Sequence, residues 1–168
     1  MENIILFKED ARRLRFTDEF DLAIMLCEGA FPLMETDEMN YQILLNARKS
    51  LRSHGKLIFT TLNGLYPLYQ SVRQLVDSGE KEGVATAPAN TFDLMTFRDH
   101  NTIYLEDDSG TRRQIQCNER YYVPSEITWL LKSAGFKTVN IFGAKLGAFS
   151  REDHLTPEDF EMLVVAEL

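Results

Sequence analysis

The sequence predicts an α/β fold, in which helices cover a mainly parallel β-sheet. The first observation is that residues 21–62 read as an apolar strand, an amphipathic helix and a second apolar strand, joined by short connections. A β–α–β order of this kind implies that the two strands run parallel. The second observation is the composition: 168 residues with 44% hydrophobic and 26% charged side chains are typical of one globular domain. We therefore expect a single α/β domain over residues 1–168.

Three elements form the predicted βαβ unit. Asp21–Leu26 is a continuous apolar run, as expected of a strand that is buried on both faces. Thr36–Ser53 has apolar residues at helical spacing, and either Thr36 or Asp37 can cap its first turn. Leu57–Leu62 is a second apolar run and predicts the neighbouring parallel strand.

The second half of the chain adds helices, an insertion and two strands. Tyr66–Asp77 predicts a helix, and Ser78–Asn90 reads as a linker. An antiparallel β insertion is expected over residues 91–118, because three segments alternate with period two: Thr91–Arg98, Thr102–Glu106 and Arg112–Cys117. The remaining elements are a helix at Ile127–Ala134 and strands at Lys137–Phe142 and Phe160–Ala166.

Charge and cysteine content exclude several classes of function. The net charge is −8, and the basic residues cluster only briefly, at Arg12, Arg13 and Arg15, so nucleic acid is not expected as the main partner. Cys27 and Cys117 share no spacing motif, which argues against a disulfide framework and a zinc site; we expect free thiols, at least one of them buried. No long apolar segment or signal peptide is visible, so a cytoplasmic protein without a membrane partner is expected.

Five segments, taken in order, resemble a known family. They are similar to the second half of a class I S-adenosylmethionine-dependent methyltransferase of the small-molecule type, and the resemblance covers essentially the whole chain. The segments are Asp10-Ala11-Arg12, Phe20-Asp21-Leu22-Ala23, Cys27-Glu28-Gly29-Ala30-Phe31, the turn Leu51–Ile58, and Tyr121–Phe136. Ser53 and His54 depart from the family's proline and glycine in that turn. The resemblance implies a partial Rossmann-like sheet, with a parallel core and an antiparallel last strand.

The resemblance also implies S-adenosylmethionine as the cofactor and assigns residues to its site. The adenine side is implied at Asp10, Ala11 and Arg12, and the methyl-donor side at Cys27, Glu28 and Phe31. Asp10 carries the cofactor prediction, because a carboxylate accepts a hydrogen bond from the adenine amino group; the alternative is an ordinary turn residue. For Glu28 the alternative is a solvated loop residue.

An acceptor pocket is predicted near the carboxyl ends of the central strands, where α/β proteins bind ligands. Its candidate residues are Asn63, Tyr66, Tyr69, Arg120, Tyr121 and Tyr122. For the last two the alternative is that one packs in the core and one is exposed, and Trp129 is expected in the core. Methyl transfer requires alignment and exclusion of water rather than a metal or a triad, so no metal site is predicted and no catalytic residue is assigned.

The chain departs from the family in one large respect. Its first glycine is Gly29, so the sequence offers no glycine-rich loop for the methionine part of the cofactor before that point. In the family, two further strands separate the counterparts of Ile4–Phe7 and Ala23–Leu26. Ile4–Phe7, the centre of a strand predicted at Glu2–Lys8, must therefore pair directly with Ala23–Leu26, attach to another chain, or stay loose.

Two hypotheses about function stay open. In the first, the chain is the C-terminal portion of a methyltransferase for a small-molecule acceptor and is incomplete alone. The missing N-terminal half would then either come from another chain, in trans, or be lost through a shortened reading frame. In the second, it is a non-catalytic remnant or partner subunit that folds as a homodimer and binds no cofactor. A dehydrogenase half is disfavoured by the Tyr-Tyr-x-Pro-Ser-Glu segment at residues 121–126. We expect the isolated chain not to bind S-adenosylmethionine.

Overall fold

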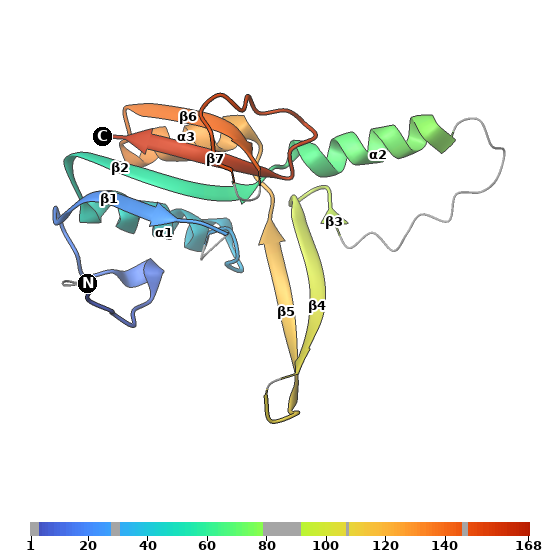
Figure 1. The fold of residues 1–168 in the computed structure, drawn as a ribbon, viewed down its shortest axis with the longest axis horizontal. Coiled ribbons are helices and arrows are strands. Elements are labelled where there is room, and N and C mark those ends of the chain that lie inside the picture. Colours follow the sequence, from blue (N-terminus) through green and yellow to red (C-terminus); the bar gives the residue numbers. More distant parts are fainter. Residues whose placement is uncertain (1–3, 28–30, 79–91, 107, 146–147) are drawn as a thin grey trace.

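The sheet of the α/β domain has a parallel core and one antiparallel strand. The computed structural model describes residues 4–27, 31–78, 92–106, 108–145 and 148–168. Within these residues a four-stranded sheet has the order β1-β2-β7-β6 (Figure 1). β7 runs antiparallel to both of its neighbours, and β1 pairs with β2 in parallel. The predicted fold class is therefore confirmed, with strands β1 Phe20–Met25, β2 Leu51–Leu62, β6 Thr138–Ala144 and β7 Glu161–Glu167.

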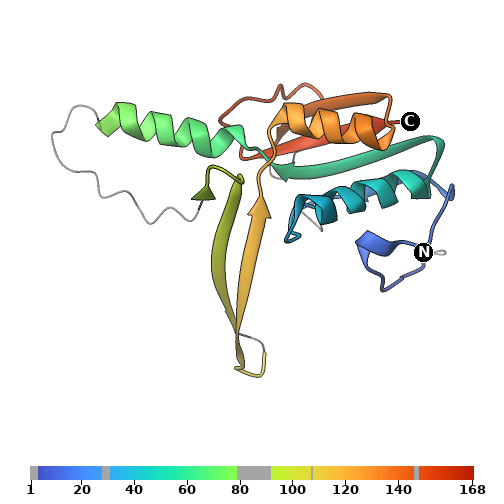
Figure 2. The ribbon, with the colours of Figure 1, turned by 180° about the vertical axis from the view of Figure 1, so that it is seen from behind.

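Two helices cover one face of this sheet. Figures 1 and 2 show α1, Asp37–Ser50, and α3, Pro124–Ala134, side by side on the same face. Thr36 caps α1 as predicted, since its side chain accepts a hydrogen bond from the amide of Met39. The core lies between helices and sheet and includes Phe31, Leu44, Phe59, Ile127, Leu131, Met162 and Val164.

α1 ends three residues earlier than the predicted Thr36–Ser53 helix. Leu51 is fully buried and already belongs to β2. The pairing of β1 with β2 jumps from Leu51 to Lys56 while β1 advances only from Phe20 to Leu22. The intervening residues therefore bulge out of the sheet. Apolar spacing alone assigned Leu51 to the helix, but its buried side chain belongs to the first residue of the strand.

The predicted core position of Trp129 is wrong. Its side chain is 68% exposed, whereas Ile127 and Leu131 on the same helix are fully buried. Ile127 and Leu131, one turn apart, face the sheet. Residue 129 lies half a turn away from each of them, on the opposite side of the helix. The expected split of Tyr121 and Tyr122 into one buried and one exposed side chain is also wrong, because both are buried.

A β-hairpin and a helix extend away from the main sheet (Figure 1). β4, Arg98–Glu106, and β5, Arg112–Arg120, form the hairpin, and the short β3, Phe92–Asp93, pairs with the root of β4. These strands confirm the predicted antiparallel insertion, with β5 two residues longer than the expected boundary at residue 118. α2, Leu65–Ser78, follows β2; the linker predicted at Ser78–Asn90 lies almost entirely outside the described residues.

The predicted strand at Glu2–Lys8 is wrong for the residues that the structure describes. Residues 4–8 have no strand pairing, and Leu6 is 90% exposed; residues 1–3 lie outside the described chain. A strand needs a hydrogen-bonding neighbour, and in the described chain β1 pairs with β2 alone. On β1 itself, Ala23 and Met25 pack toward the core, while Leu22 and Ile24 on the opposite face stay exposed.

The two cysteines do not form a disulfide. Cys27 is exposed and Cys117 is half-buried, so the expectation of free thiols is confirmed and the expectation of a buried one is wrong. Among the described residues, no helix is long and apolar enough to cross a membrane.

Candidate functional site

The carboxyl ends of β1 and β2 meet the root of the hairpin at one edge of the sheet. Tyr122 follows β5 and forms a parallel bridge with Asn63, which directly follows β2. The amide of Tyr122 donates to the carbonyl of Leu62 (3.3 Å), and the amide of Gly64 donates to the carbonyl of Tyr122 (2.9 Å). A Cβ at Gly64 would lie 3.1 Å from the backbone of Tyr122, a tight contact that would move this backbone by a few tenths of an ångström, so the close approach favours glycine. The insertion is thus fixed above the edge where ligands bind in α/β folds.

On the predicted adenine side, the carboxylate of Asp10 is already paired. Asp10 caps the short helix η1, Ala11–Arg13, by accepting a hydrogen bond from the amide of Arg12 (2.9 Å). The Arg12 guanidinium also donates to both carboxylate oxygens, with the shortest distance 2.7 Å. Hydrogen bonds from Arg12 lower the pKa of Asp10 to about 2. An adenine amino group would have to share this carboxylate with Arg12.

η1 is attached to the side of α1. The side-chain amide of Asn46 donates to the carbonyl of Ala11 (3.2 Å), and Nη1 of Arg12 lies 3.8 Å from Sδ of Met39. Arg12 also lines an open cavity of about 390 Å³ between η1 and the first turns of α1. A carboxylate and a backbone amide beside a cavity suit an adenine ring in chemical type, so the structure is compatible with the adenine assignment.

The predicted methyl-donor residues occupy different environments. Cys27 follows β1 with a left-handed backbone (φ 56°), is exposed, and its amide donates to Oγ1 of Thr60 (2.9 Å). Phe31 is fully buried, and its ring is stacked on that of Tyr122 at 4.9 Å. Glu28 lies outside the described residues. Cys27 is therefore the described member of this set that a ligand at the sheet edge can reach.

The acceptor-side residues Arg120 and Tyr122 meet in one ion-pair network. The Arg120 guanidinium lies 4.5 Å from the centre of the Tyr122 ring and pairs with Glu126 (2.8 Å) and Asp37 (3.3 Å). Asp37 also pairs with Arg98 at 2.5 Å. Burial raises the pKa of the Tyr122 phenol, so the side chain stays neutral and accepts a hydrogen bond from Asn40 (3.1 Å).

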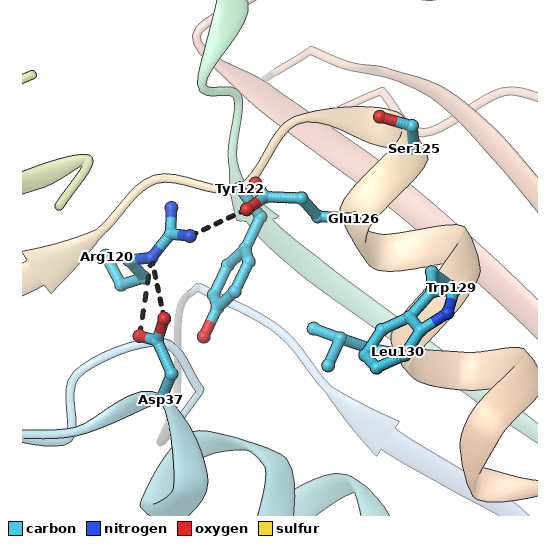
Figure 3. Close-up of a pocket in the computed structure, with 7 residues that line it drawn as sticks. All are labelled: Asp37, Arg120, Tyr122, Ser125, Glu126, Trp129 and Leu130. Atoms are coloured by element: carbon cyan, nitrogen blue, oxygen red, sulfur yellow. Dashed lines mark hydrogen bonds and ion pairs between the residues drawn. The ribbon is translucent and has the colours of Figure 1, made fainter. Parts of the chain in front are cut away.

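This network forms the floor of a cavity between α1 and α3. The cavity has a volume of about 420 Å³ and is lined by Asp37, Arg120, Tyr122, Ser125, Glu126, Trp129 and Leu130 (Figure 3). The sequence prediction missed five of these as site residues: Asp37, Ser125, Glu126, Trp129 and Leu130. Glu126, Trp129 and Leu130 stand at i, i+3 and i+4 on α3, a spacing that puts three side chains on one helix face and that the sequence does show.

The other predicted acceptor residues lie apart from this cavity. Asn63 is fully buried and its side chain bonds only backbone groups, those of Leu65, Thr156 and Asp159. Tyr66 and Tyr121 both contact the ring of Phe160. The hydroxyl of Tyr69 donates to Glu158 (2.7 Å), which raises the pKa of the tyrosine. The structure thus brings together Arg120 and Tyr122, while the remaining four candidates surround the loop after β6.

A metal ion has no ready-made site in the described part of the chain. No group of three or more histidine, cysteine, aspartate or glutamate side chains there is arranged to hold one. Charged, aromatic and hydrogen-bonding side chains line the cavity between α1 and α3.

Comparisons with known proteins find similarity in structure alone. No protein-family model matches the chain, and no curated protein matches its sequence. The methyltransferase CcbJ of Streptomyces caelestis superposes with a TM-score of 0.64 at 13% identity, over 94% of this chain and 65% of its own. An S-adenosylmethionine-dependent methyltransferase of Clostridium acetobutylicum gives 0.57 at 12% identity, over 95% of this chain and 63% of its own.

A third solved structure extends the same pattern. It is an S-adenosylmethionine-dependent methyltransferase of Thermotoga maritima, described as a possible histamine N-methyltransferase, with a TM-score of 0.51 at 15% identity over 96% of this chain and 62% of its own. The chain thus spans less than two thirds of the length of these structures. Similarity at such low identity establishes the fold rather than the activity. The chain has the class I S-adenosylmethionine-dependent methyltransferase fold.

Proposed function

We propose that this chain takes part in methyl transfer from S-adenosylmethionine to a small-molecule acceptor. The observation that carries the proposal is the sheet: the order β1-β2-β7-β6, with β7 antiparallel, superposes on methyltransferases over 94–96% of the chain. A fold hosts many functions, so the site has to support the activity separately. Support comes from the cavity at the roots of α1 and α3, which lies beside the carboxyl edge of β2.

On the donor side, the residues proposed to hold the cofactor are Asp10, Ala11, Arg12, Cys27, Glu28 and Phe31. Asp10 would accept from the adenine amino group, with Arg12 keeping the carboxylate ionised. Cys27 lies two residues beyond the end of β1, at the sheet edge. Phe31 acts from within the core, by supporting Tyr122 through ring stacking.

On the acceptor side, Arg120 and Tyr122 are proposed to line the pocket. The other four candidates, Asn63, Tyr66, Tyr69 and Tyr121, lie apart from it against the loop after β6. When bound, the cofactor supplies an electrophilic methyl group, and displacement at that carbon needs alignment and exclusion of water. The ion pairs of Arg120 with Asp37 and Glu126 hold the roots of α1 and α3 at a fixed separation. Such a rigid frame is what alignment of an acceptor requires.

The activity is proposed to need a further polypeptide beside β1, which supplies the methionine side of the cofactor site. In the described chain β1 has a pairing partner on one side, and a face with Leu22 and Ile24 is exposed. Phe20 and Leu26 continue this face, and the Phe7 ring reaches Phe20 through Phe16. The exposed side chains of Phe7, Phe20, Leu22, Ile24 and Leu26 are called the β1 surface; an exposed apolar face of this kind is typical of a surface that another chain covers.

A second candidate function is a non-catalytic subunit that covers the β1 surface by dimerising and binds no cofactor. One observation favours it, that Asp10 is engaged by Arg12, and the sequence of β1 is compatible with pairing to a second copy of itself. Antiparallel pairing about Ala23 sets Leu22 opposite Ile24 and Phe20 opposite Leu26, with no like charges facing each other.

Calorimetry with S-adenosylhomocysteine distinguishes these candidates. The chain is titrated alone and after co-expression with the polypeptide encoded directly upstream of it. We expect the chain alone not to bind S-adenosylhomocysteine and the co-expressed preparation to bind it. In that preparation Asp10→Asn should weaken the binding by about tenfold, because the charged hydrogen-bond acceptor is lost. Asp108→Asn, which neutralises an exposed carboxylate in the turn of the hairpin, is the matched control. Absence of binding in both preparations, together with a stable homodimer, would support the non-catalytic subunit.

A further inference from the structure

The cavity between α1 and α3 has an apolar wall and an acidic wall. Trp129 and Leu130 form the apolar wall one turn along α3, and Figure 3 shows Glu126 reaching toward Arg120 and Asp37 on the opposite side. The exposed indole is unusual, because a large aromatic side chain on a helix surface normally finds cover in the core or an interface. The cavity is of the size that a small organic molecule occupies.

The charge that a ligand can reach in this cavity is negative. The side chains of Asp37 and Glu126 are 53% and 38% exposed, whereas that of Arg120 is 8% exposed. Arg98, the other cation bound to Asp37, is 9% exposed. The guanidinium groups are therefore largely covered, and the two carboxylate side chains are the more exposed members of a network whose formal charges balance.

An ammonium group suits both walls at once. Carboxylates bind an ammonium through charge-assisted hydrogen bonds, and an indole face attracts it through the ring quadrupole. An anionic ligand would be repelled by the exposed carboxylates. A purely apolar ligand would displace water from them without supplying a hydrogen bond in return. Leu130 and the Trp129 ring leave room for a flat apolar body next to the charged group.

We propose that this cavity binds the acceptor of the methyl transfer, and that the acceptor is an organic amine on a flat apolar body. The inference rests on the proposed methyltransferase function. In the transfer, the amine loses its proton to water, and the nitrogen lone pair forms the bond to the methyl carbon. The carbon–sulfur bond breaks at the same time and leaves its electron pair on sulfur.

Binding is tested on the full chain through its single tryptophan, which reports directly on the cavity. Fluorescence excited at the red edge of the indole band is followed during titration with 2-phenylethylamine, 2-phenylethanol or 3-phenylpropionate, which share a ring and differ in charge. We expect a saturable change with the amine and binding at least about fivefold tighter than that of the alcohol. Binding of the anion as tight as that of the amine, or no saturable change, overturns the inference.

Variants locate the site. Trp129→Ala removes an exposed side chain and leaves the fold intact; amine binding, followed by calorimetry, is expected to fall at least about fivefold. Glu126→Gln is expected to weaken the amine by a similar factor, while Glu152→Gln, which neutralises an exposed carboxylate elsewhere, leaves it unchanged. Unaltered amine binding in Trp129→Ala overturns the site. Since no methyl donor is present, amine binding without methylation by the co-expressed preparation would count against the proposed function alone.

Discussion

At the scale of single residues, Tyr122 connects the sheet edge to the candidate cavity. Its backbone bridges to Asn63, its ring stacks on Phe31 and lies beneath the Arg120 guanidinium, and its hydroxyl accepts from Asn40. One buried side chain thus fixes the positions of β2, α1 and the root of the hairpin. A substitution at Tyr122 would therefore change both the lining of the cavity and the packing of these elements.

Replacement of Tyr122 by phenylalanine should lower stability by about 1–2 kcal/mol, because Asn40 loses a buried hydrogen-bond partner. Burial raises the pKa of the Tyr122 phenol above its usual value of 10.0. The unfolded chain therefore releases this proton first, and the wild type should lose stability as the pH rises above about 10. Denaturant unfolding at pH 7 and pH 11 should show a smaller alkaline loss in the variant. Tyr104→Phe, at an exposed residue, should leave both values unchanged.

The buried amide of Asn63 allows a test of whether a predicted acceptor residue is structural. Its side chain bonds the carbonyls of Thr156 and Asp159 and the amide of Leu65. Asn63→Ala should therefore cost about 2–3 kcal/mol in urea unfolding, since three partly buried backbone hydrogen bonds are lost together. Phenylethylamine affinity of the folded fraction should not change. Full stability with lost affinity would instead assign Asn63 to the acceptor.

At the scale of elements, residue spacing predicted the type of most helices and strands but not their environment. β2, β6, β7, α1 and α3 follow from apolar runs and capping residues, because those signals are local. The boundary at Leu51 depended on pairing with β1, and the exposure of Trp129 depended on which face of α3 meets the sheet. The cavity combines residues from α1, β5 and α3, whose proximity depends on tertiary contacts that no local pattern encodes.

The start of α1 offers a test of local encoding. The side chain of Thr36 accepts from the amide of Met39, and Asp37 and Glu38 follow in the first turn. Thr36→Ala should lower stability by about 1 kcal/mol in thermal or urea unfolding, whereas Thr36→Ser, which retains the hydroxyl, should restore most of it. Equal stability of the alanine and serine variants would show that the cap contributes nothing.

At the scale of the whole molecule, the two faces of β1 differ in a way that the sequence did not reveal. The apolar run Asp21–Leu26 predicts burial on both sides, yet α1 covers one face and the other remains open in the described chain. Phe7, Phe16 and Phe20 continue this open face as an aromatic cluster. Exposed apolar surface beside an unpaired strand edge favours association with another chain.

The isolated chain should therefore self-associate through the β1 surface. Sedimentation of the wild type at 1–50 μM should show a dimer; this range brackets a dimer dissociation constant of about 10 μM. Ile24→Lys should raise that dissociation constant at least about tenfold, because the added charge would be buried in the interface. Val72→Lys, at an exposed residue of α2, is the matched control. A stable monomer throughout this range would contradict the role assigned to the β1 surface.

Methyl transfer by this chain is proposed to require a second polypeptide that completes the β1 surface. The most direct measurement is transfer of a radiolabelled methyl group from S-adenosylmethionine to 2-phenylethylamine, by the chain alone and by the preparation co-expressed with the polypeptide encoded directly upstream. We expect labelled product from the co-expressed preparation and none from the chain alone. Equal transfer by the isolated chain, or none by either preparation while the amine is bound, would contradict this proposal.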